Sequence, residues 1–208
     1  EAKADGIRAG GFRQMKISIV RFIPLSKLEE LVRRVPLKKK DETGGQIQLY
    51  ANARILLRKM HPDELNPGSR YVLQDQLEFQ RELRKTLSQD HGIDLFNLEG
   101  GYVIQDGAGK QLALVPPVVE VTEETMKYHD TRGDVPYDAP TVVKMNVVVD
   151  GLHRLFLARF GDSDSLCSVL HIAGVPREYP FYALPNQWDE VRVCQEVPSQ
   201  DKKKTYRF

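Results

Sequence analysis

Five consecutive residues, Asp150-Gly151-Leu152-His153-Arg154, combine a turn former with side chains that suit anion binding. A β-branched run precedes them and an apolar helical run follows, so the sequence predicts a strand, a glycine turn and a helix. The first N–H groups of a helix lack partners, and the helix dipole there favours negative charge. Arg154 adds a planar fork of donors that suits phosphate. We therefore predict a phosphate site, most simply for a nucleotide, formed by Gly151, Leu152, His153 and Arg154.

Each residue of this turn has more than one interpretation. Asp150 is expected to do one of three things: orient His153, hold a magnesium-bound water or cap the helix. The alternative for His153 is a hydrogen-bonded core histidine, and for Arg154 a structural ion pair. Gly151 supplies the backbone freedom that the turn needs.

Composition limits the class of protein. The chain has 208 residues, enough for one domain with a sizeable core or for two small ones. Its content of 41% hydrophobic and 28% charged residues is normal for a globular protein. A formal net charge of +1 gives no overall attraction to nucleic acid, so a DNA-binding face would have to be local. No apolar run is long enough to span a membrane, and residues 1–11 do not resemble a signal peptide.

The positions of the cysteines and histidines indicate whether a metal site is present and whether the protein works in a reducing compartment. Cys167 and Cys194 lie far apart, which disfavours a disulfide framework and indicates a reducing, cytoplasmic location. The five histidines have no metal-ligand spacing with each other or with the cysteines, so we predict no structural zinc and assign no metal ligands. Cys167 falls in a predicted strand, which favours a buried, inert thiol.

Hydrophobic periodicity in the first half predicts several elements. We expect a strand over residues 15–22, a helix over 27–34, and a strand followed by a short helix over 47–60. The clearest helix covers residues 73–89 and is stopped by His91-Gly92. Residues 102–114 predict a β-hairpin.

The second half predicts the elements around the turn. We expect a strand at residues 118–121, a capped helical turn at 122–129 and a central strand at 142–149. A helix from Leu152 to about Phe160 and a strand over 166–172 follow. This order predicts an α+β (mixed α/β) fold with a mixed sheet flanked by helices. We expect residues 1–14 to form a flexible tail, and residues 15–208 to form a single domain with an inserted helical segment at about 47–92.

The order of motifs between residues 115 and 176 resembles the ParB/sulfiredoxin-like superfamily. The matching pieces are Val115-Pro116-Pro117-Val118-Val119, Val147-Val148-Val149, the Asp-Gly-Leu-His-Arg turn, and the strand and glycine turn from Ser168 to Pro176. The resemblance implies the superfamily's mixed sheet, an additional N-terminal helical region, and a nucleotide whose phosphates sit on the His-Arg turn.

Members of this superfamily use the turn in different ways. Sulfiredoxins carry a cysteine between Gly and His, where this chain has Leu152, so their chemistry should be absent. ParB partition proteins carry a Gly-Glu-Arg-Arg-like turn, bind CTP and clamp DNA, but this chain lacks that glutamate. Free-serine kinases place a catalytic glutamate on the first helix, where Glu29 and Glu30 lie here. The Asp-Gly-x-His-Arg form also resembles a family linked to DNA phosphorothioate modification.

The resemblance implies two main functions. The first is binding of ATP or a related nucleotide with Mg²⁺, for phosphoryl transfer to a small hydroxyl substrate or for nucleotide hydrolysis. Asp150, His153 and Glu30 are then the candidate catalytic residues, and a solvated helix face is the alternative interpretation of Glu30. Competing carboxylates follow the Pro-Pro strand at Glu120, Glu123 and Glu124.

The alternative is a DNA-binding component of a DNA modification, defence or partition system, including a nuclease. Lysine runs at residues 38–40 and 202–204 favour it, and the near-neutral net charge opposes it. A third hypothesis is an interaction module without catalytic activity, whose partner surface is the aromatic segment between Tyr179 and Trp188. A homo-oligomer is one form that this module could take. Those aromatic residues otherwise stack a base or fill a core.

Overall fold

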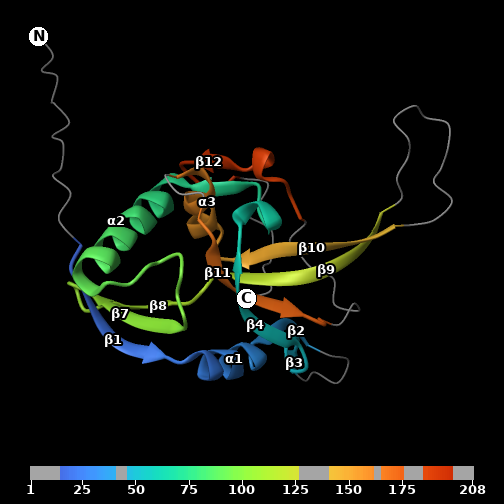
Figure 1. Ribbon diagram of the computed structural model, residues 1–208, viewed down its shortest axis with the longest axis horizontal. Helices are drawn as coiled ribbons and strands as arrows, with labels where there is room; N and C mark the ends of the chain where they lie inside the picture. The colour runs from blue at the N-terminus through green and yellow to red at the C-terminus, as the bar shows by residue number, and fades with distance from the viewer. Residues whose placement is uncertain (1–14, 41–45, 127–140, 162–164, 176–184, 199–208) are drawn as a thin grey trace, which may run out of the picture.

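The computed structural model describes residues 15–40, 46–126, 141–161, 165–175 and 185–198, and its centre is a five-stranded mixed sheet (Figure 1). The order of strands is β4-β11-β9-β10-β5. Strand β9 lies parallel to β11 and antiparallel to β10, while β4 runs antiparallel to β11 and β5 parallel to β10. The predicted α+β class with a mixed sheet is confirmed. The strands are β4 (Arg54–Met60), β5 (Asn66–Pro67), β9 (Val118–Met126), β10 (Thr141–Asp150) and β11 (Cys167–Ala173).

Smaller sheets surround the central one. The predicted hairpin is confirmed and joins the first strand in the antiparallel order β1-β7-β8. Two more sheets have two strands each: β2 pairs with β3, and β6 pairs with β12. These strands are β1 (Ile17–Ile23), β2 (Pro36–Lys40), β3 (Gln46–Gln48), β6 (Tyr71–Leu73), β7 (Gly101–Asp106), β8 (Gln111–Leu114) and β12 (Arg192–Cys194).

Helices cover both faces of the central sheet. Figure 1 shows α2 and α3 on one side and α1 on the other. Helix α2 ends where Gly92 adopts a left-handed φ of 65°, which confirms the predicted stop. The helices are α1 (Leu25–Arg33), α2 (Gln74–His91) and α3 (Leu152–Phe160), with the 3₁₀ turns η1 (Pro62–Glu64) and η2 (Trp188–Glu190). In the described ranges, none of the helices is long and apolar enough to cross a membrane.

Strand β11 lies at the boundary of two cores. Its residues from Cys167 to Ile172 are all buried, and successive side chains point to opposite faces. Val169 packs in the core beneath α3 with Val119 and Leu155, while Leu170 packs on the α1 side. Because both faces are covered, β11 is buried along its length and includes the buried polar residues Ser168 and His171 among its apolar ones.

Two predictions of helical structure are wrong. Residues 55–60 belong to β4. Ile55 and Leu57 face the α1 core, while Arg54, Leu56 and Arg58, which alternate with them, are exposed, and this is a period of two. The segment 47–92 contains both edge strands of the central sheet as well as α2. Residues 122–126 continue β9 instead of forming a helical turn, because pairing with β10 extends to Met126. The predicted tail, residues 1–14, lies outside the described residues.

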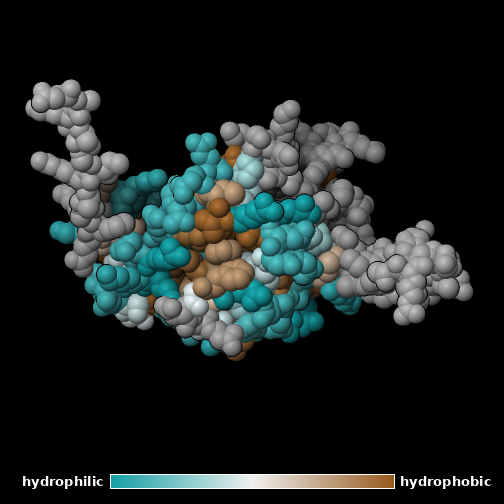
Figure 2. Space-filling view, turned by 90° about the horizontal axis from the view of Figure 1, so that it is seen from above, coloured by the Kyte–Doolittle hydropathy of each residue, from teal (hydrophilic) through white to brown (hydrophobic). Residues whose placement is uncertain are grey.

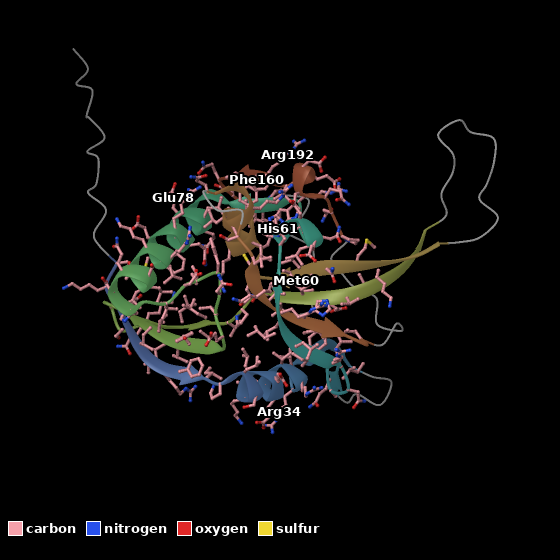
Figure 3. All side chains as sticks on the ribbon, in the orientation of Figure 1. Arg34, Met60, His61, Glu78, Phe160 and Arg192 are labelled. Atoms are coloured by element: carbon pink, nitrogen blue, oxygen red, sulfur yellow. The ribbon has the colours of Figure 1, made fainter. Side chains whose placement is uncertain are left out.

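The predicted core roles of two residues are confirmed. Trp188 is buried, and its indole N–H donates to the Pro62 carbonyl oxygen at 2.8 Å. Burial raises the pKa of the Cys167 thiol to about 11, so this thiol is protonated and inert at neutral pH. The aromatic residues between 179 and 182 lie outside the described ranges. In Figure 2, apolar side chains gather in the middle of the face that lies above α3. Phe160, at the end of α3, is an exposed apolar residue and is labelled near the top of Figure 3.

Candidate functional site

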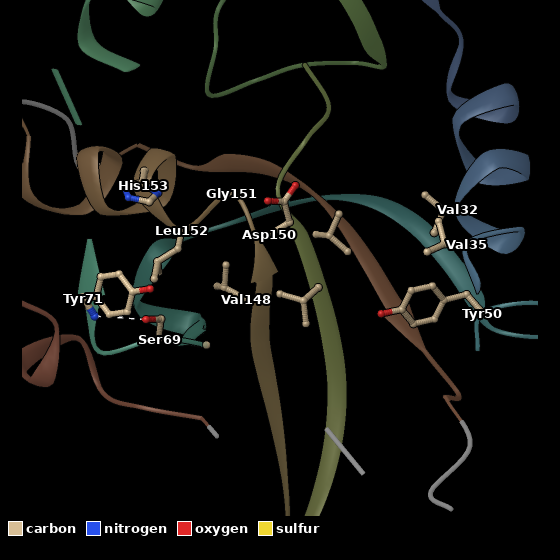
Figure 4. Close-up of a pocket in the computed structure, with 13 residues that line it drawn as sticks. Val32, Val35, Tyr50, Ser69, Tyr71, Val148, Asp150, Gly151, Leu152 and His153 are labelled. Carbon is tan, nitrogen blue, oxygen red and sulfur yellow. Dashed lines mark hydrogen bonds between the residues drawn. The ribbon is translucent and has the colours of Figure 1, made fainter. Parts of the chain in front are cut away.

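A cavity of about 580 Å³ lies where β10 ends and α3 begins (Figure 4). Its volume falls in the range of about 300–1,000 Å³ that is usual for small-molecule sites. The end of α1 and Tyr50 form one wall, the segment after β5 forms the other, and the predicted turn lies between them. The lining residues are Val32, Val35, Tyr50, Gly68, Ser69, Tyr71, Val118, Val148, Val149, Asp150, Gly151, Leu152 and His153.

Gly151 shapes the turn for two separate reasons. Its φ of 84° lies in the left-handed region, and a Cβ at this position would come within 2.7 Å of Pro117 Cβ and 2.9 Å of Pro117 Cα. Its carbonyl oxygen accepts the N–H groups of Arg154 and Leu155, each at 3.1 Å, and so begins α3. The N–H groups of Leu152 and His153 precede these bonds and have no acceptor among the described residues. The turn therefore presents two helix N-terminal donors beside the cavity, as predicted from the sequence.

His153 lines the cavity but already has a structural partner. Its Nε2 accepts the backbone N–H of Leu73 at 2.9 Å, and Leu73 is the N-cap of α2. In the neutral ring the proton is therefore on Nδ1, which is the nitrogen left to donate to a ligand. Burial lowers the pKa of His153, while Asp75 and Asp150 oppose this effect. The ring is thus a neutral donor that links α3 to α2.

This hydrogen bond predicts a pH dependence of stability. Because the pKa of folded His153 is lower than its ordinary value of 6.5, the unfolded chain binds more protons as the pH falls through that value. Stability from this group is complete above about pH 6.5 and declines below it. In His153→Gln the side-chain oxygen accepts the Leu73 N–H without titrating. Urea denaturation should show that the wild type loses more stability than the variant between pH 7 and pH 5, whereas parallel curves would contradict this assignment.

Arg154 lies outside the cavity. The side chain is buried, with 7% of its surface exposed, and its Nη1 donates to the Val115 carbonyl oxygen at 2.7 Å. Burial lowers the pKa of Arg154 to about 10, so the side chain stays cationic at neutral pH. The guanidinium therefore ties α3 to the segment that enters β9. Position 154 follows the half-buried start of the helix and precedes Leu155, which is fully buried.

The two candidate carboxylates are not brought together. Asp150 is exposed and lines the cavity. Glu30 is not among the cavity-lining residues, although Val32 on the same helix is. Its carboxylate accepts from Lys27 Nζ at 2.7 Å and pairs with Arg34. The hydrogen bond from Lys27 and the charges of Arg34 and Lys27 lower the pKa of Glu30. In this arrangement Glu30 is part of a surface ion-pair cluster.

Two tyrosines that sequence reasoning did not single out complete the cavity. The hydroxyl groups of Tyr50 and Tyr71 point into it from opposite walls in Figure 4. The Tyr50 hydroxyl donates to Glu120 Oε2 at 2.9 Å, and both of these residues are buried. Glu120 was one of the competing carboxylates, whereas the side chains of Glu123 and Glu124 lie outside the described part. Within the described residues, no group of three or more histidine, cysteine or carboxylate side chains could hold a metal ion.

The sequence of the chain matches the model of one protein family. The family model of the ParB CE domain matches residues 27–192, which is more than half of the chain. The chain belongs to the ParB CE domain family. The match confirms the predicted ParB-like resemblance and extends it from residues 115–176 to the segment between α1 and β12. No curated protein and no solved structure matches the chain.

Proposed function

We propose that this ParB CE domain binds a nucleotide unit in the turn cavity and works in association with DNA in the cytoplasm. The observation that carries the proposal is the cavity itself. A space of about 580 Å³ opens at the one turn that resembles the nucleotide-binding turn of ParB-like proteins, in a chain of that family. Membership of the family supports the proposed association with DNA, since partition proteins of the ParB type act on DNA.

The lining of the cavity suits the parts of a nucleotide. Valines on both β9 and β10 give it an apolar floor, and the two tyrosines flank that floor with rings and hydroxyl groups, an environment that suits a base and a sugar. The unpaired N–H groups of Leu152 and His153 suit a phosphate. Lysine and arginine are absent from the thirteen described lining residues, so the backbone of α3 would provide the main attraction for the phosphate.

Asp150 suits a magnesium ion that accompanies the phosphates. It is the single carboxylate among the lining residues that the structure describes, and it lies next to the helix N-terminus. Bound Mg²⁺ would neutralise phosphate charge, and Asp150 would hold the ion with water completing its shell. The proposal covers binding of ATP or a related nucleotide and includes no phosphoryl-transfer step, because Glu30 is paired at the surface and does not line the cavity.

Two variants of Leu152 that differ only in charge test the proposal. Leu152 is half-buried at the start of α3, so Leu152→Gln and Leu152→Glu lose the same packing contact. The glutamate also places a negative charge beside the N–H groups that would hold the phosphate. Isothermal titration with ATP and CTP, each with and without Mg²⁺, should show wild-type binding that Leu152→Gln retains. We expect Leu152→Glu to weaken it by about tenfold or more, as a repulsion of about 1.4 kcal/mol would require.

The control for this experiment is Asp90→Asn, which alters an exposed carboxylate at the end of α2 outside the cavity lining. It should leave nucleotide affinity unchanged. If both Leu152 variants bind as tightly as the wild type, the nucleotide does not occupy the turn. If the wild type itself binds no nucleotide, the turn is structural.

A further inference from the structure

We propose that Arg54, Arg58 and His171 form a second, phosphate-binding site at the exposed β4 edge of the central sheet, which contacts the phosphodiester backbone of a nucleic acid. A separate hollow of about 210 Å³ is lined by these three residues together with Leu56 and Ala173. None of them lines the turn cavity. The inference deepens the DNA-associated part of the proposed function but rests on different residues.

The strand register brings the three basic residues together. His171 on β11 lies opposite Leu56 on the edge strand β4. Side chains two positions on either side of Leu56 share its face, so Arg54 and Arg58 are the diagonal neighbours of His171. Diagonal pairs in a sheet are about 7–8 Å apart, within reach of long side chains. One arginine therefore lies on each side of the imidazole.

A hydrogen-bond chain fixes the orientation of the imidazole. Asn146 Nδ2 donates to the Glu64 carbonyl oxygen at 3.1 Å, so its Oδ1 is the atom that faces His171. The His171 Nε2 lies 3.2 Å from this Oδ1 and must therefore donate to it. In the neutral ring Nδ1 then carries the lone pair, and in the protonated ring Nδ1–H becomes a donor. His171 is buried, so the ring is held in place rather than free to rotate.

The charges around this ring have no counter-ion in the described part of the chain. Arg54 and Arg58 are exposed, and neither forms a hydrogen bond or an ion pair with any described residue. Burial and the charges of Arg58 and Arg54 lower the pKa of His171, which indicates a locally positive potential. Guanidinium groups match the geometry of phosphate oxygens, so an anion of this class would relieve the repulsion.

The openness of the site favours a nucleic acid over a small metabolite. Both arginines are exposed on an edge strand, whereas the turn cavity is a recessed pocket between two walls. A local cluster of such arginines would also allow a chain of net charge +1 to bind DNA.

The test compares two double variants that each remove two positive charges. Arg54→Gln/Arg58→Gln removes the proposed contacts. Arg21→Gln/Lys59→Gln is the control, because both residues are exposed without a described partner, and Lys59 lies on β4 itself next to Arg58. Fluorescence anisotropy with a short labelled duplex, repeated over a range of salt concentrations, measures affinity and its salt dependence. We expect Arg54→Gln/Arg58→Gln to lose about tenfold or more in affinity and to reduce the salt slope by about two, whereas the control should change little.

A second measurement tells whether the bound phosphate belongs to a nucleic acid or to a small molecule. Inorganic phosphate and the duplex are each titrated into the wild type while the imidazole signals of His171 are followed by NMR. Shifts with the duplex support a nucleic-acid backbone, and shifts with phosphate when the duplex does not bind support a phosphorylated small molecule at the same site. The site is overturned if His171 shifts with neither ligand, or if the two double variants lose the same affinity. Leu152→Glu tests the turn cavity separately, so the failure of one site is distinguishable from the failure of the other.

Discussion

Gly151→Ala is expected to lower the free energy of unfolding by about 3 kcal/mol, because the methyl group meets two independent penalties. The left-handed φ of 84° costs an L-residue roughly 1–2 kcal/mol. The new Cβ would also lie 2.7 Å from Pro117 Cβ, so the turn and the start of β9 must separate. Urea denaturation monitored by circular dichroism measures the loss.

Gly92→Ala separates the two penalties. Gly92 has a similar φ of 65°, but no atom lies within 4 Å of the place that a Cβ would occupy, so this variant reports the cost of the backbone conformation alone. We expect it to lose roughly 1–2 kcal/mol. The difference between the two glycine variants is then the cost of contact with Pro117. Equal losses in the two variants would show that the turn moves away from Pro117 without cost, and the expected penalty for contact with Pro117 would be wrong.

Arg154→Ala is expected to cost about 3 kcal/mol of stability. The buried guanidinium donates to the Val115 carbonyl oxygen, and a hydrogen bond from a charged group contributes about 1.5–3 kcal/mol. Truncation to alanine also removes the packing of the long side chain and leaves the carbonyl group without this donor. Arg154→Met keeps most of the volume, so it should lose less than the alanine variant. Arg21→Ala, on the exposed surface of β1, should change stability by less than about 0.5 kcal/mol.

Arg154→Met also decides between the two interpretations of this residue. Because Arg154 does not line the cavity, the folded methionine variant should bind a nucleotide as tightly as the wild type. If this variant remains folded but loses nucleotide binding, Arg154 reaches the ligand in the complex. The phosphate-ligand role that the sequence predicts would then be correct, and the structural role would be secondary.

Both effects act on the same part of the fold. Gly151 packs against Pro117, and Arg154 binds the carbonyl group of Val115, so the start of α3 is held to the chain that enters β9 at two points. His153 adds a third connection, to the N-cap of α2. The turn that faces the cavity is therefore fixed from behind by residues of its own motif, which is the kind of support that a preorganised binding site needs.

Local sequence was sufficient to predict the turn and its neighbours. A β-branched run, a glycine and an amphipathic run specify strand, turn and helix through interactions between residues close in sequence, and the structure contains all three around Gly151. The stop of α2 at Gly92 was predictable for the same reason. The helical turn expected at residues 122–129 failed, because pairing with the distant strand β10 outweighs a local capping pattern.

Tertiary structure alone decided which side chains face the cavity. Tyr50 and Tyr71 come from segments without a motif. They line the same cavity because β4, which follows Tyr50, and β5, which precedes Tyr71, are both strands of the central sheet. Periodicity does not reveal that Arg154 points into the protein, since that depends on Val115, 39 residues earlier. Likewise, Arg54 and Arg58 flank His171 only through the register of β4 against β11. Sequence determines local backbone geometry, but long-range strand pairing determines the chemistry of a surface built from several segments.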